Sequence, residues 1–277
     1  MTVKPKRILT IAGSDSGGGA GIQADLKTIT ALGGFGMSAI TALTAQNTLG
    51  VQGIYEIPAD FVKKQITSVV SDIGVDSVKT GMLANAEITS AVAAMIREFR
   101  IELLVVDPVM RAKGGASLIG EEAVRTMVKE LIPLAYLLTP NIPEAEVLAG
   151  MKINKIEHMK QAAQAIKQLG PKNVLVKGGH LDESYAELVD VLYDGVEFYE
   201  FRAPRIDTKD THGTGCTYSA ALATLLALGL PLPLAVREAK EYITEAIRRA
   251  FRLGAGHGPT NHLAPVLRDK RQIGGER

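Results

Sequence analysis

The sequence predicts an α/β fold, a doubly wound and mostly parallel sheet flanked by helices, with an antiparallel hairpin at one edge. Apolar β-rich runs alternate with segments of helical periodicity along most of the chain. Several of these runs are apolar at consecutive positions, as in strands that helices cover on both faces. An Asp-Gly turn joins two short β-rich runs in the last third of the chain. We expect one domain over residues 1–267.

Each element follows from its own pattern. The predicted parallel strands are residues 7–12, 37–45, 75–79, 103–107, 134–138 and 174–177. Between them, apolar residues recur every three or four positions, for example Ile22, Leu26 and Ile29, which indicates helices. The runs ELVDVLY and VEFYEF, joined by Asp194-Gly195, predict the hairpin. Two helices follow, near residues 213–228 and 234–251, and residues 268–277 are expected to form a frayed tail.

Composition excludes several classes of function. The chain has 277 residues, 46% of them hydrophobic and 22% charged, and a net charge of +1. A nearly neutral chain has no bulk attraction for nucleic acid or an anionic membrane. The long uncharged stretches are interrupted by glycine or proline and leave about 15 apolar residues, fewer than a membrane span needs. One cysteine and no secretory segment favour a cytoplasmic protein. We expect no nucleic acid and no membrane among its partners.

The first glycine cluster, residues 13–21, fits neither standard phosphate loop. It has no Gly-Lys-Ser/Thr and does not have GxGxxG spacing, which also disfavours a nicotinamide-dependent oxidoreductase. Two interpretations remain open. The cluster is either a flexible turn or bare backbone placed against a ligand at the carboxyl edge of the sheet.

The second cluster, Asp210-Thr211-His212-Gly213-Thr214-Gly215-Cys216, runs into an uncharged helix. Unpaired N–H groups and the helix dipole at such a start favour a phosphate. Cys216 falls in the first turn, where these charges are expected to lower the thiol pKa. The alternative is a small buried thiol without a chemical role.

Three charged residues end predicted strands or begin helices. Asp107 and Glu144 are candidate Mg²⁺ carboxylates, because Mg²⁺ beside a polyphosphate is held by one or two carboxylates and water. Lys177 precedes two glycines and is a candidate phosphate contact. The plainer alternatives are a turn former for Asp107, a first-turn helix residue for Glu144 and a surface lysine. No histidine pair has zinc-ligand spacing, and no GxSxG elbow occurs.

The motifs taken together identify a family. IAGSDSGGGAGIQADLK, TALTAQNT, KTGML, VVDPVM, TPNIPEAE, VLVKGGH and DTHGTGCTYSAAL resemble bacterial hydroxymethylpyrimidine/phosphomethylpyrimidine kinases of thiamine biosynthesis, in the ribokinase-like superfamily. The resemblance covers residues 8–262 in the right order. It implies ATP and Mg²⁺ dependence. It also implies phosphorylation of 4-amino-5-hydroxymethyl-2-methylpyrimidine, and then of its monophosphate to the diphosphate.

The resemblance also implies roles for individual residues. The positions that match the pyrimidine pocket are Gly13, Asp25, Gln46, Met82 and Val109. The positions that match the anion hole are Gly213, Thr214, Gly215 and Cys216. Lys177 matches a lysine near the ATP phosphates, while Asp107, Asn141 and Glu144 match positions that organise Mg²⁺ and its waters.

Some alternatives stay open. Many ribokinase-like sugar kinases have an aspartate as base where this chain has Cys216, so the identity of the base is not fixed. Related enzymes phosphorylate pyridoxal or pyridoxine, which makes pyridoxal kinase the runner-up. A nucleotide-binding regulator without turnover is a hypothesis of another class, disfavoured by the retained Lys177, Glu144 and Cys216. We also expect a homodimer.

Overall fold

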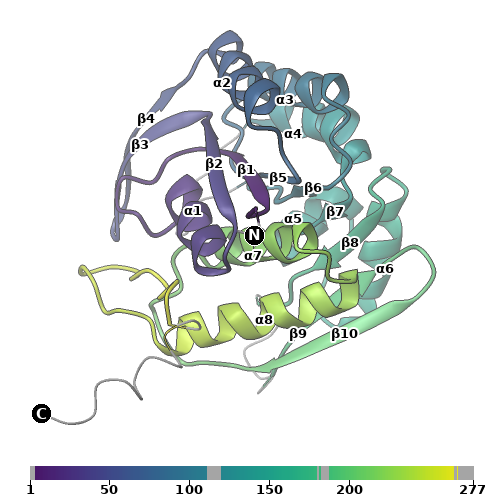
Figure 1. Ribbon diagram of the computed structural model, residues 1–277. Helices are drawn as coiled ribbons and strands as arrows, with labels where there is room; N and C mark the ends of the chain where they lie inside the picture. Colours follow the sequence, from purple (N-terminus) through teal and green to yellow (C-terminus); the bar gives the residue numbers. More distant parts are fainter. Residues whose placement is uncertain (1–3, 111–119, 180, 182–186, 265–266, 268–277) are drawn as a thin grey trace, which may run out of the picture.

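The computed structural model describes residues 4–110, 120–179, 181, 187–264 and 267 (Figure 1). The predicted tail at residues 268–277 lies outside this range. In the described residues the main sheet has eight strands in the order β10-β9-β8-β7-β6-β5-β1-β2. The strands of this sheet are β1 (Arg7–Ala12), β2 (Phe35–Ile40), β5 (Ser77–Thr80), β6 (Leu104–Val106), β7 (Leu137–Leu138), β8 (Asn173–Val176), β9 (Glu187–Tyr193) and β10 (Phe198–Pro204).

The mostly parallel sheet and its antiparallel edge are confirmed. Strands β1, β2, β5, β6, β7 and β8 pair in parallel, with Ile8 opposite Gly36 and Ser77. Strands β9 and β10 form the predicted antiparallel hairpin, and β9 is also antiparallel to β8. The parallel strands therefore present their carboxyl ends at one edge of the sheet.

Helices cover both faces of the sheet (Figure 1). One face carries α1 (Gly21–Ala31), α7 (Thr214–Ala227) and α8 (Leu232–Arg248). The other carries α2 (Ala59–Asp72), α3 (Ala86–Glu98), α4 (Glu121–Thr126), α5 (Ile142–Ala149) and α6 (Ile156–Lys167), with a π-helical turn at Met127–Leu131 and a 3-10 turn at Ile132–Leu134. The two predicted C-terminal helices are confirmed as α7 and α8.

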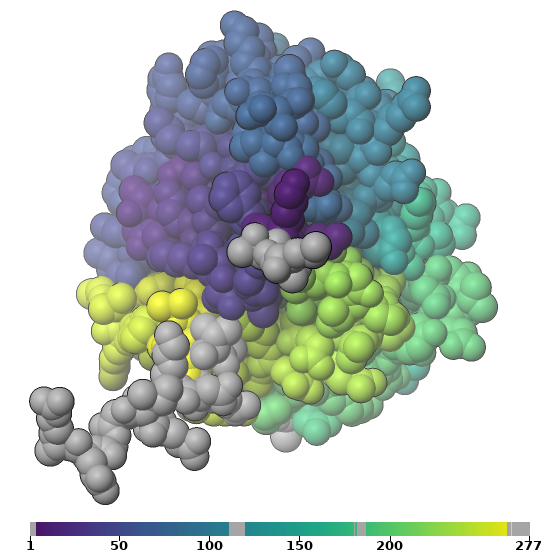
Figure 2. All heavy atoms as spheres, viewed as in Figure 1, coloured from purple at the N-terminus to yellow at the C-terminus, as the bar shows by residue number. Residues whose placement is uncertain are grey.

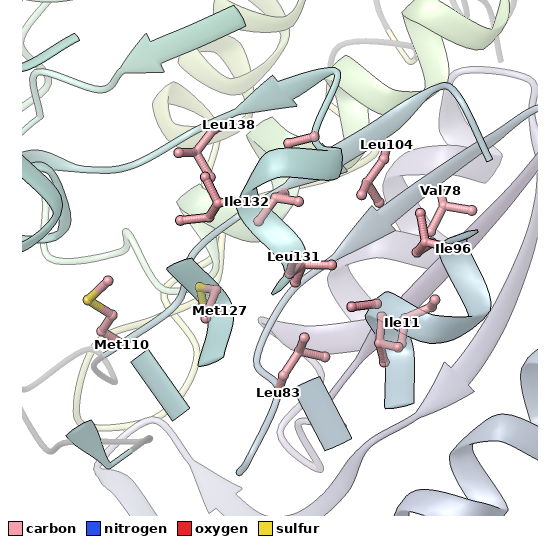
Figure 3. Packing of buried hydrophobic residues seen from close by; sticks show 14 of the residues in the cluster. Ile11, Val78, Leu83, Ile96, Leu104, Met110, Met127, Leu131, Ile132 and Leu138 are labelled. Carbon is pink, nitrogen blue, oxygen red and sulfur yellow. The ribbon is translucent and has the colours of Figure 1, made fainter. Parts of the chain in front are cut away.

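Successive residues of each central strand face opposite cores, which explains why the strands are apolar at consecutive positions. Ile8 packs with α7 and α8, whereas Leu9 packs on the other side with α2 and α3. Leu104 and Val105 divide in the same way. Figure 3 shows buried side chains of the core that includes α3, among them Val78, Ile96 and Leu104. Each fully buried side chain of this size contributes about 1.5–3 kcal/mol.

Two strand predictions are corrected. The predicted strand 37–45 is two strands, because the chain turns at Thr41, whose N–H donates to Ala12 O at 3.0 Å and whose Oγ1 donates to Met82 O at 2.7 Å. The second half, β3 (Ala42–Asn47), pairs in a separate small sheet with β4 (Gly50–Glu56), which the sequence pattern did not predict. Most of the predicted strand 134–138 is the 3-10 turn and its exit, and only β7 is extended.

The segment after α8 returns to the small sheet. His257 N–H donates to Thr48 O at 3.0 Å at the turn between β3 and β4. In the space-filling view the yellow C-terminal segment lies against atoms of the first sixty residues (Figure 2). Among the described helices, none has the length and apolar character required to cross a membrane.

Candidate active site

A cavity of ≈ 670 Å³ opens at the carboxyl edge of the parallel strands. Residues that follow three of these strands line it, namely Gly13 after β1, Asp107 after β6 and Lys177 after β8. The first turn of α7 lines it as well. Open α/β sheets bind ligands at this edge, because loops and helix starts converge there. The cavity is therefore the candidate active site.

The structure brings the predicted site residues to this cavity with one exception. The predicted residues that line it are Gly13, Gln46, Met82, Asp107, Val109, Asn141, Glu144, Lys177, Gly213, Thr214, Gly215 and Cys216. They come from segments spread over most of the chain. The cavity therefore has an apolar end, lined by Met82 and Val109, and a charged end, lined by Asp107 and Lys177.

The exception is Asp25, which lies beneath the cavity in the core. Its side chain is fully buried on α1, and its two oxygens lie 2.8 and 3.0 Å from Lys79 Nζ on β5. Thr10 Oγ1 on β1 donates to the same carboxylate at 2.6 Å. Because the side chain is fully buried and does not line the cavity, the expected contact between Asp25 and the pyrimidine is corrected to a buried ion pair.

The anion-hole motif forms the cap and first turn of α7. Gly213 has φ of 80°, and a Cβ atom there would collide with the carbonyl oxygen of Gly19. Glycine is therefore required for the two glycine loops to meet. Thr214 Oγ1 donates to Thr211 O at 2.7 Å and fixes the entry of the helix. The positive end of the helix dipole is thus presented to the cavity.

Lys177 and Asp107 form the charged wall of the cavity. Lys177 Nζ lies 2.8 Å from Asp107 Oδ1, and Ser219 Oγ donates to Asp107 Oδ2 at 3.1 Å. Burial would raise the pKa of Asp107, but the ammonium groups of Lys177 and Lys79 outweigh it and hold that pKa below its usual value. Asp107 is therefore an anion, and Lys177 presents a cation beside it.

Asn141 and Glu144 form a capping box at the start of α5. Asn141 Oδ1 accepts from Glu144 N–H at 2.9 Å, and Glu144 Oε2 accepts from Asn141 N–H at 2.8 Å. Burial raises the pKa of Glu144 to about 7, with Lys177 opposing the rise and Asp107 adding to it. The capping box fixes the orientation of this carboxyl group toward the cavity.

These residues fit a magnesium ion carried by a nucleotide rather than one enclosed by protein. The described residues contain no group of three or more His, Cys, Asp and Glu side chains arranged to hold a metal ion. Mg²⁺ beside phosphates needs only one or two carboxylates, with phosphate and water oxygens completing its shell. Asp107 and Glu144 line the same cavity and supply that chemistry.

The expected lowering of the thiol pKa is wrong. Burial raises the pKa of Cys216 to about 11, although Lys79 opposes the rise. The backbone N–H of Gly21, at the start of α1, also opposes the rise of this pKa. Two helix starts therefore meet at this thiol, but desolvation outweighs them.

The other end of the cavity has the character of a ring pocket. Met82 and Val109 line it with apolar surface, and Gly13 is so close to Met82 that a Cβ would lie 2.5 Å from the Met82 methyl carbon. The Thr44 hydroxyl lies 2.8 Å from Ser14 O and 3.2 Å from Gln46 Oε1, two acceptors for its one proton. A side-chain amide beside apolar walls suits a flat ring with polar edge atoms.

Asp15 and His212 are site residues that sequence reasoning missed. His212 Nε2 lies 2.7 Å from Asp15 Oδ2 and 3.4 Å from Gln46 Nε2. Asp15 also accepts the N–H groups of Gly17, Gly19 and Ala20. The pair joins the two glycine loops. The signal available was the position of both residues inside the motifs SDSGGGAG and DTHGTGC.

A second buried ion pair supports Lys177. Asp190 Oδ2 lies 2.7 Å from Lys240 Nζ and accepts from Tyr218 OH at 3.1 Å, while Asp190 Oδ1 accepts from Gly178 N–H at 2.9 Å. All three side chains line the cavity. Because Gly178 follows Lys177 directly, this cluster fixes the turn that carries the lysine. Sequence reasoning did not single out these side chains.

Comparison with known families and relatives agrees with this geometry. A model of the family described as phosphomethylpyrimidine kinase matches residues 15–261. The hydroxymethylpyrimidine/phosphomethylpyrimidine kinase of Bacillus subtilis is 50% identical over 93% of this chain and 95% of its own length. The thiamine biosynthesis bifunctional protein of Geobacter sulfurreducens is 57% identical over 95% of this chain, which spans 54% of that longer protein.

Solved structures with the same fold include two kinds of vitamin kinase. A Bacillus subtilis pyridoxal kinase in complex with ADP superposes with a TM-score of 0.88 at 40% identity, covering 95% of this chain and 100% of its own. A phosphomethylpyrimidine kinase from Clostridium difficile gives 0.78 at 48% identity, covering 87% and 99%. The fold and the cavity thus define a small-molecule kinase of the ribokinase-like class. Within that class, the chain belongs to the phosphomethylpyrimidine kinase family.

Proposed function

We propose that this kinase transfers the γ-phosphoryl group of ATP to the hydroxymethyl group of 4-amino-5-hydroxymethyl-2-methylpyrimidine. We propose that it then phosphorylates the monophosphate to the diphosphate, in the biosynthesis of thiamine diphosphate. The observation that carries the proposal is the family match over residues 15–261, which includes both ends of the cavity.

The ring end supplies recognition. In our proposal the Gln46 amide pairs with the polar edge of the aminopyrimidine, while Met82 and Val109 contact its faces. The geometry that supports this is the position of Gln46 in the lining of the cavity and the apolar lining beside Gly13. Asp25 is left out of the ring contact in our proposal, because its side chain is fully buried and does not line the cavity.

The charged end supplies transition-state stabilisation. The γ-phosphoryl group would lie between Lys177 and the first turn of α7, where Gly213 and Gly215 would offer backbone N–H groups. The Thr214 N–H donates to Thr211 O at 3.4 Å. Asp107 and Glu144 would hold Mg²⁺ through its waters, with Asn141 fixing the Glu144 carboxyl. Such an ion, when bound, neutralises charge on the phosphates.

The transfer step has a defined balance. A bond forms between the hydroxymethyl oxygen and the γ-phosphorus, and the bond from that phosphorus to the β–γ bridging oxygen breaks, so that ADP leaves. The hydroxyl proton passes to a base, for which Cys216 is our candidate. With a thiol pKa of about 11, proton removal is expected late in the step, and positioning and charge stabilisation dominate the rate.

Pyridoxal is the second candidate substrate. One observation favours it, namely that the pyridoxal kinases superpose on this chain more closely than the phosphomethylpyrimidine kinase structure does, with TM-scores of 0.88 and 0.78. Sequence identity favours the pyrimidine instead, because it is 40% to this pyridoxal kinase and 48% to the phosphomethylpyrimidine kinase. We place the pyrimidine first because three curated relatives that match at 50% identity or more are named for thiamine biosynthesis or for the pyrimidine kinase.

A substrate panel tests the proposal. The protein is incubated with ATP, Mg²⁺ and the hydroxymethylpyrimidine, its monophosphate or pyridoxal, and products are identified by mass. We expect the pyrimidine monophosphate from the first substrate and the diphosphate from the second. Omitting Mg²⁺ should remove both products. ATP binding without any phosphorylated product would instead support a non-catalytic regulator.

Two properties of the whole protein also belong to this proposal. We expect a homodimer, for which the exposed apolar side chains of the small sheet, Leu43, Ile54 and Tyr55, are candidate contacts. We expect it in the cytoplasm, where its single cysteine stays reduced. Sedimentation and cell fractionation measure these two properties.

A further inference from the structure

The first glycine loop, residues 13–21, is folded around a carboxylate of its own. Asp15 Oδ1 accepts from Gly17 N–H at 2.8 Å. Asp15 Oδ2 accepts from Gly19 N–H at 3.1 Å and from Ala20 N–H at 2.8 Å. These backbone donors bond within the loop, so a phosphate would have to displace the carboxylate to use them. The loop is therefore organised by Asp15 and not by a bound anion.

Asp15 is buried and charged. It is 2% exposed, and burial opposes its ionisation. The bonds from His212 and from the backbone N–H groups outweigh burial and hold the pKa of Asp15 below its usual value. Hydrogen bonds to a buried charge are strong, and the loss of a partner leaves that charge poorly satisfied. Asp15 therefore fixes every group that it bonds.

His212 joins this carboxylate to the start of α7. His212 Nε2 lies 2.7 Å from Asp15 Oδ2. The imidazole also packs on the loop, because a Cβ at Gly19 would lie 2.5 Å from His212 Cδ2. The backbone N–H of His212 donates to Gly258 O at 3.0 Å, in the segment after α8. The next residue, Gly213, caps α7.

The two glycine loops belong to opposite ends of the cavity. Gly13, in the first loop, contacts Met82 at the ring end. Gly213, in the second loop at residues 210–216, begins the phosphoryl end. Transfer between two bound groups needs their reacting atoms aligned at about 3–3.5 Å, and a misplacement of about 1 Å can cost about 10²-fold in rate. The contact between Asp15 and His212 fixes the separation of the loops.

We propose that Asp15 and His212 are positioning residues that align the acceptor hydroxyl group with the γ-phosphoryl group by holding the two glycine loops together. The pair acts through the loops, so its loss should impair transfer more than the binding of either ligand. The proposal rests on the kinase reaction of the proposed function, but not on which alcohol is used.

The first test removes the imidazole and compares kcat with affinity. His212→Leu lacks the N–H donor to Asp15. With the alcohol that the parent phosphorylates fastest, we expect kcat to fall by about 10²-fold. The dissociation constants of that alcohol and of the ATP analogue AMP-PCP, each measured alone by calorimetry, should stay close to the parent values. A histidine that merely stabilises the fold would lower both affinities together with kcat.

Two amide variants and a control complete this test. His212→Gln offers side-chain N–H donors with a reach close to that of Nε2, so we expect it to recover most of the lost kcat. His212→Asn is one carbon shorter and should not recover it. The matched control is His257→Leu, which removes an exposed imidazole from the segment after α8. This control should turn over at the parent rate.

Amide hydrogen exchange of the ligand-free protein gives a second readout that needs no turnover. Local opening of a hydrogen-bonded segment sets the rate of its exchange. We expect His212→Leu to raise exchange in the first glycine loop, where its own backbone is absent. Asp15→Asn should raise exchange at the start of α7, on the other side of the contact. The hairpin of β9 and β10 should exchange as in the parent.

A fall in kcat with retained affinities, recovered by glutamine and not by asparagine, supports the proposal. Parent-like kcat in His212→Leu overturns it, and so does a loss that both amides recover equally or that neither recovers. If Asp15→Asn does not fold, the His212 variants decide.

The proposed function can fail separately. If the parent phosphorylates none of the alcohols, the kinase reaction is wrong and hydrogen exchange decides the inference. Raised exchange across the contact then supports the link between the loops, and unchanged exchange overturns it. If the parent is an active kinase and His212→Leu keeps its kcat, only the positioning inference is wrong.

Discussion

Lys177 Nζ lies 2.8 Å from Asp107 Oδ1, so the cation that follows β8 is held by the carboxylate that follows β6. This contact orients the lysine across the carboxyl edge of the sheet. It also keeps a buried charge paired until phosphate arrives. When the phosphate and its metal ion bind, Lys177 can contact the phosphate and Asp107 can contact the metal ion or its waters.

Replacing Lys177 by methionine should raise the activation barrier by about 2–4 kcal/mol and so lower kcat, because a donor to the transferring phosphoryl group is lost. Binding of the pyrimidine, measured by calorimetry, should change little. The matched control is Lys172→Met, an exposed lysine at the other end of β8. Near-parent turnover in Lys177→Met would place the phosphate site elsewhere.

Gln46→Ala should show the reverse pattern. The variant removes the amide from the ring end, which typically costs about 1–3 kcal/mol of binding. We expect weaker binding of the pyrimidine in calorimetry, with nucleotide binding close to the parent value. Gln52→Ala, on the exposed surface of β4, is the control. Parent-like pyrimidine affinity in Gln46→Ala would remove Gln46 from the ring contact.

Cys216→Ala tests the base directly. If the thiolate accepts the hydroxyl proton, turnover should fall by about 10²–10⁴-fold. Because the thiol pKa is about 11, the thiolate fraction of the parent grows with pH below that value. The part of the parent's turnover that depends on the thiolate should therefore rise with pH up to about pH 10. Steady-state rates at several pH values check both statements. A loss smaller than tenfold would leave positioning by the anion hole as the main effect.

His262 should make the fold sensitive to acid. Its ring is buried, Nε2 has no hydrogen-bond partner among the described residues, and burial lowers its pKa from 6.5 to about 4, with Lys27 adding to the effect. Between these values the unfolded chain binds the proton and the folded chain does not. Stability therefore falls as the pH drops from 6.5 toward 4, by about 3 kcal/mol in total from this group.

Urea unfolding at pH 7, 5.5 and 4.5 measures this effect. His262→Gln should lose less stability than the parent over the same range. His257→Gln, in an exposed loop, should follow the parent curve. Equal pH slopes in all three proteins would contradict the assignment to His262.

The sequence predicted the parallel strands well because buried strands are apolar on both faces, as Leu104 and Val105 illustrate. It failed at Thr41, because residues on both sides of that turn are equally β-rich and no glycine or proline marks the break. The hydrogen bonds that make the turn come from Ala12 and Met82, which are distant in the sequence.

The site was predictable where a motif carried the chemistry in its own residues. Gly213 and Lys177 were placed at the cavity from local spacing and from resemblance. Asp25 was not placed correctly, because its partner Lys79 lies in a short strand and nothing in the local sequence marks this lysine as buried. The thiol pKa of Cys216 was misjudged for the same reason, since burial is a property of the whole fold.

The central claim is that the hydroxymethylpyrimidine is the preferred alcohol of this kinase. A competition reaction tests it most directly, with the pyrimidine and pyridoxal at equal concentration in one tube and the two phosphorylated products followed by mass. The ratio of the initial rates equals the ratio of the two kcat/KM values. We predict faster formation of the pyrimidine monophosphate, followed by its diphosphate. Faster formation of pyridoxal phosphate, or no pyrimidine product at all, would contradict the account.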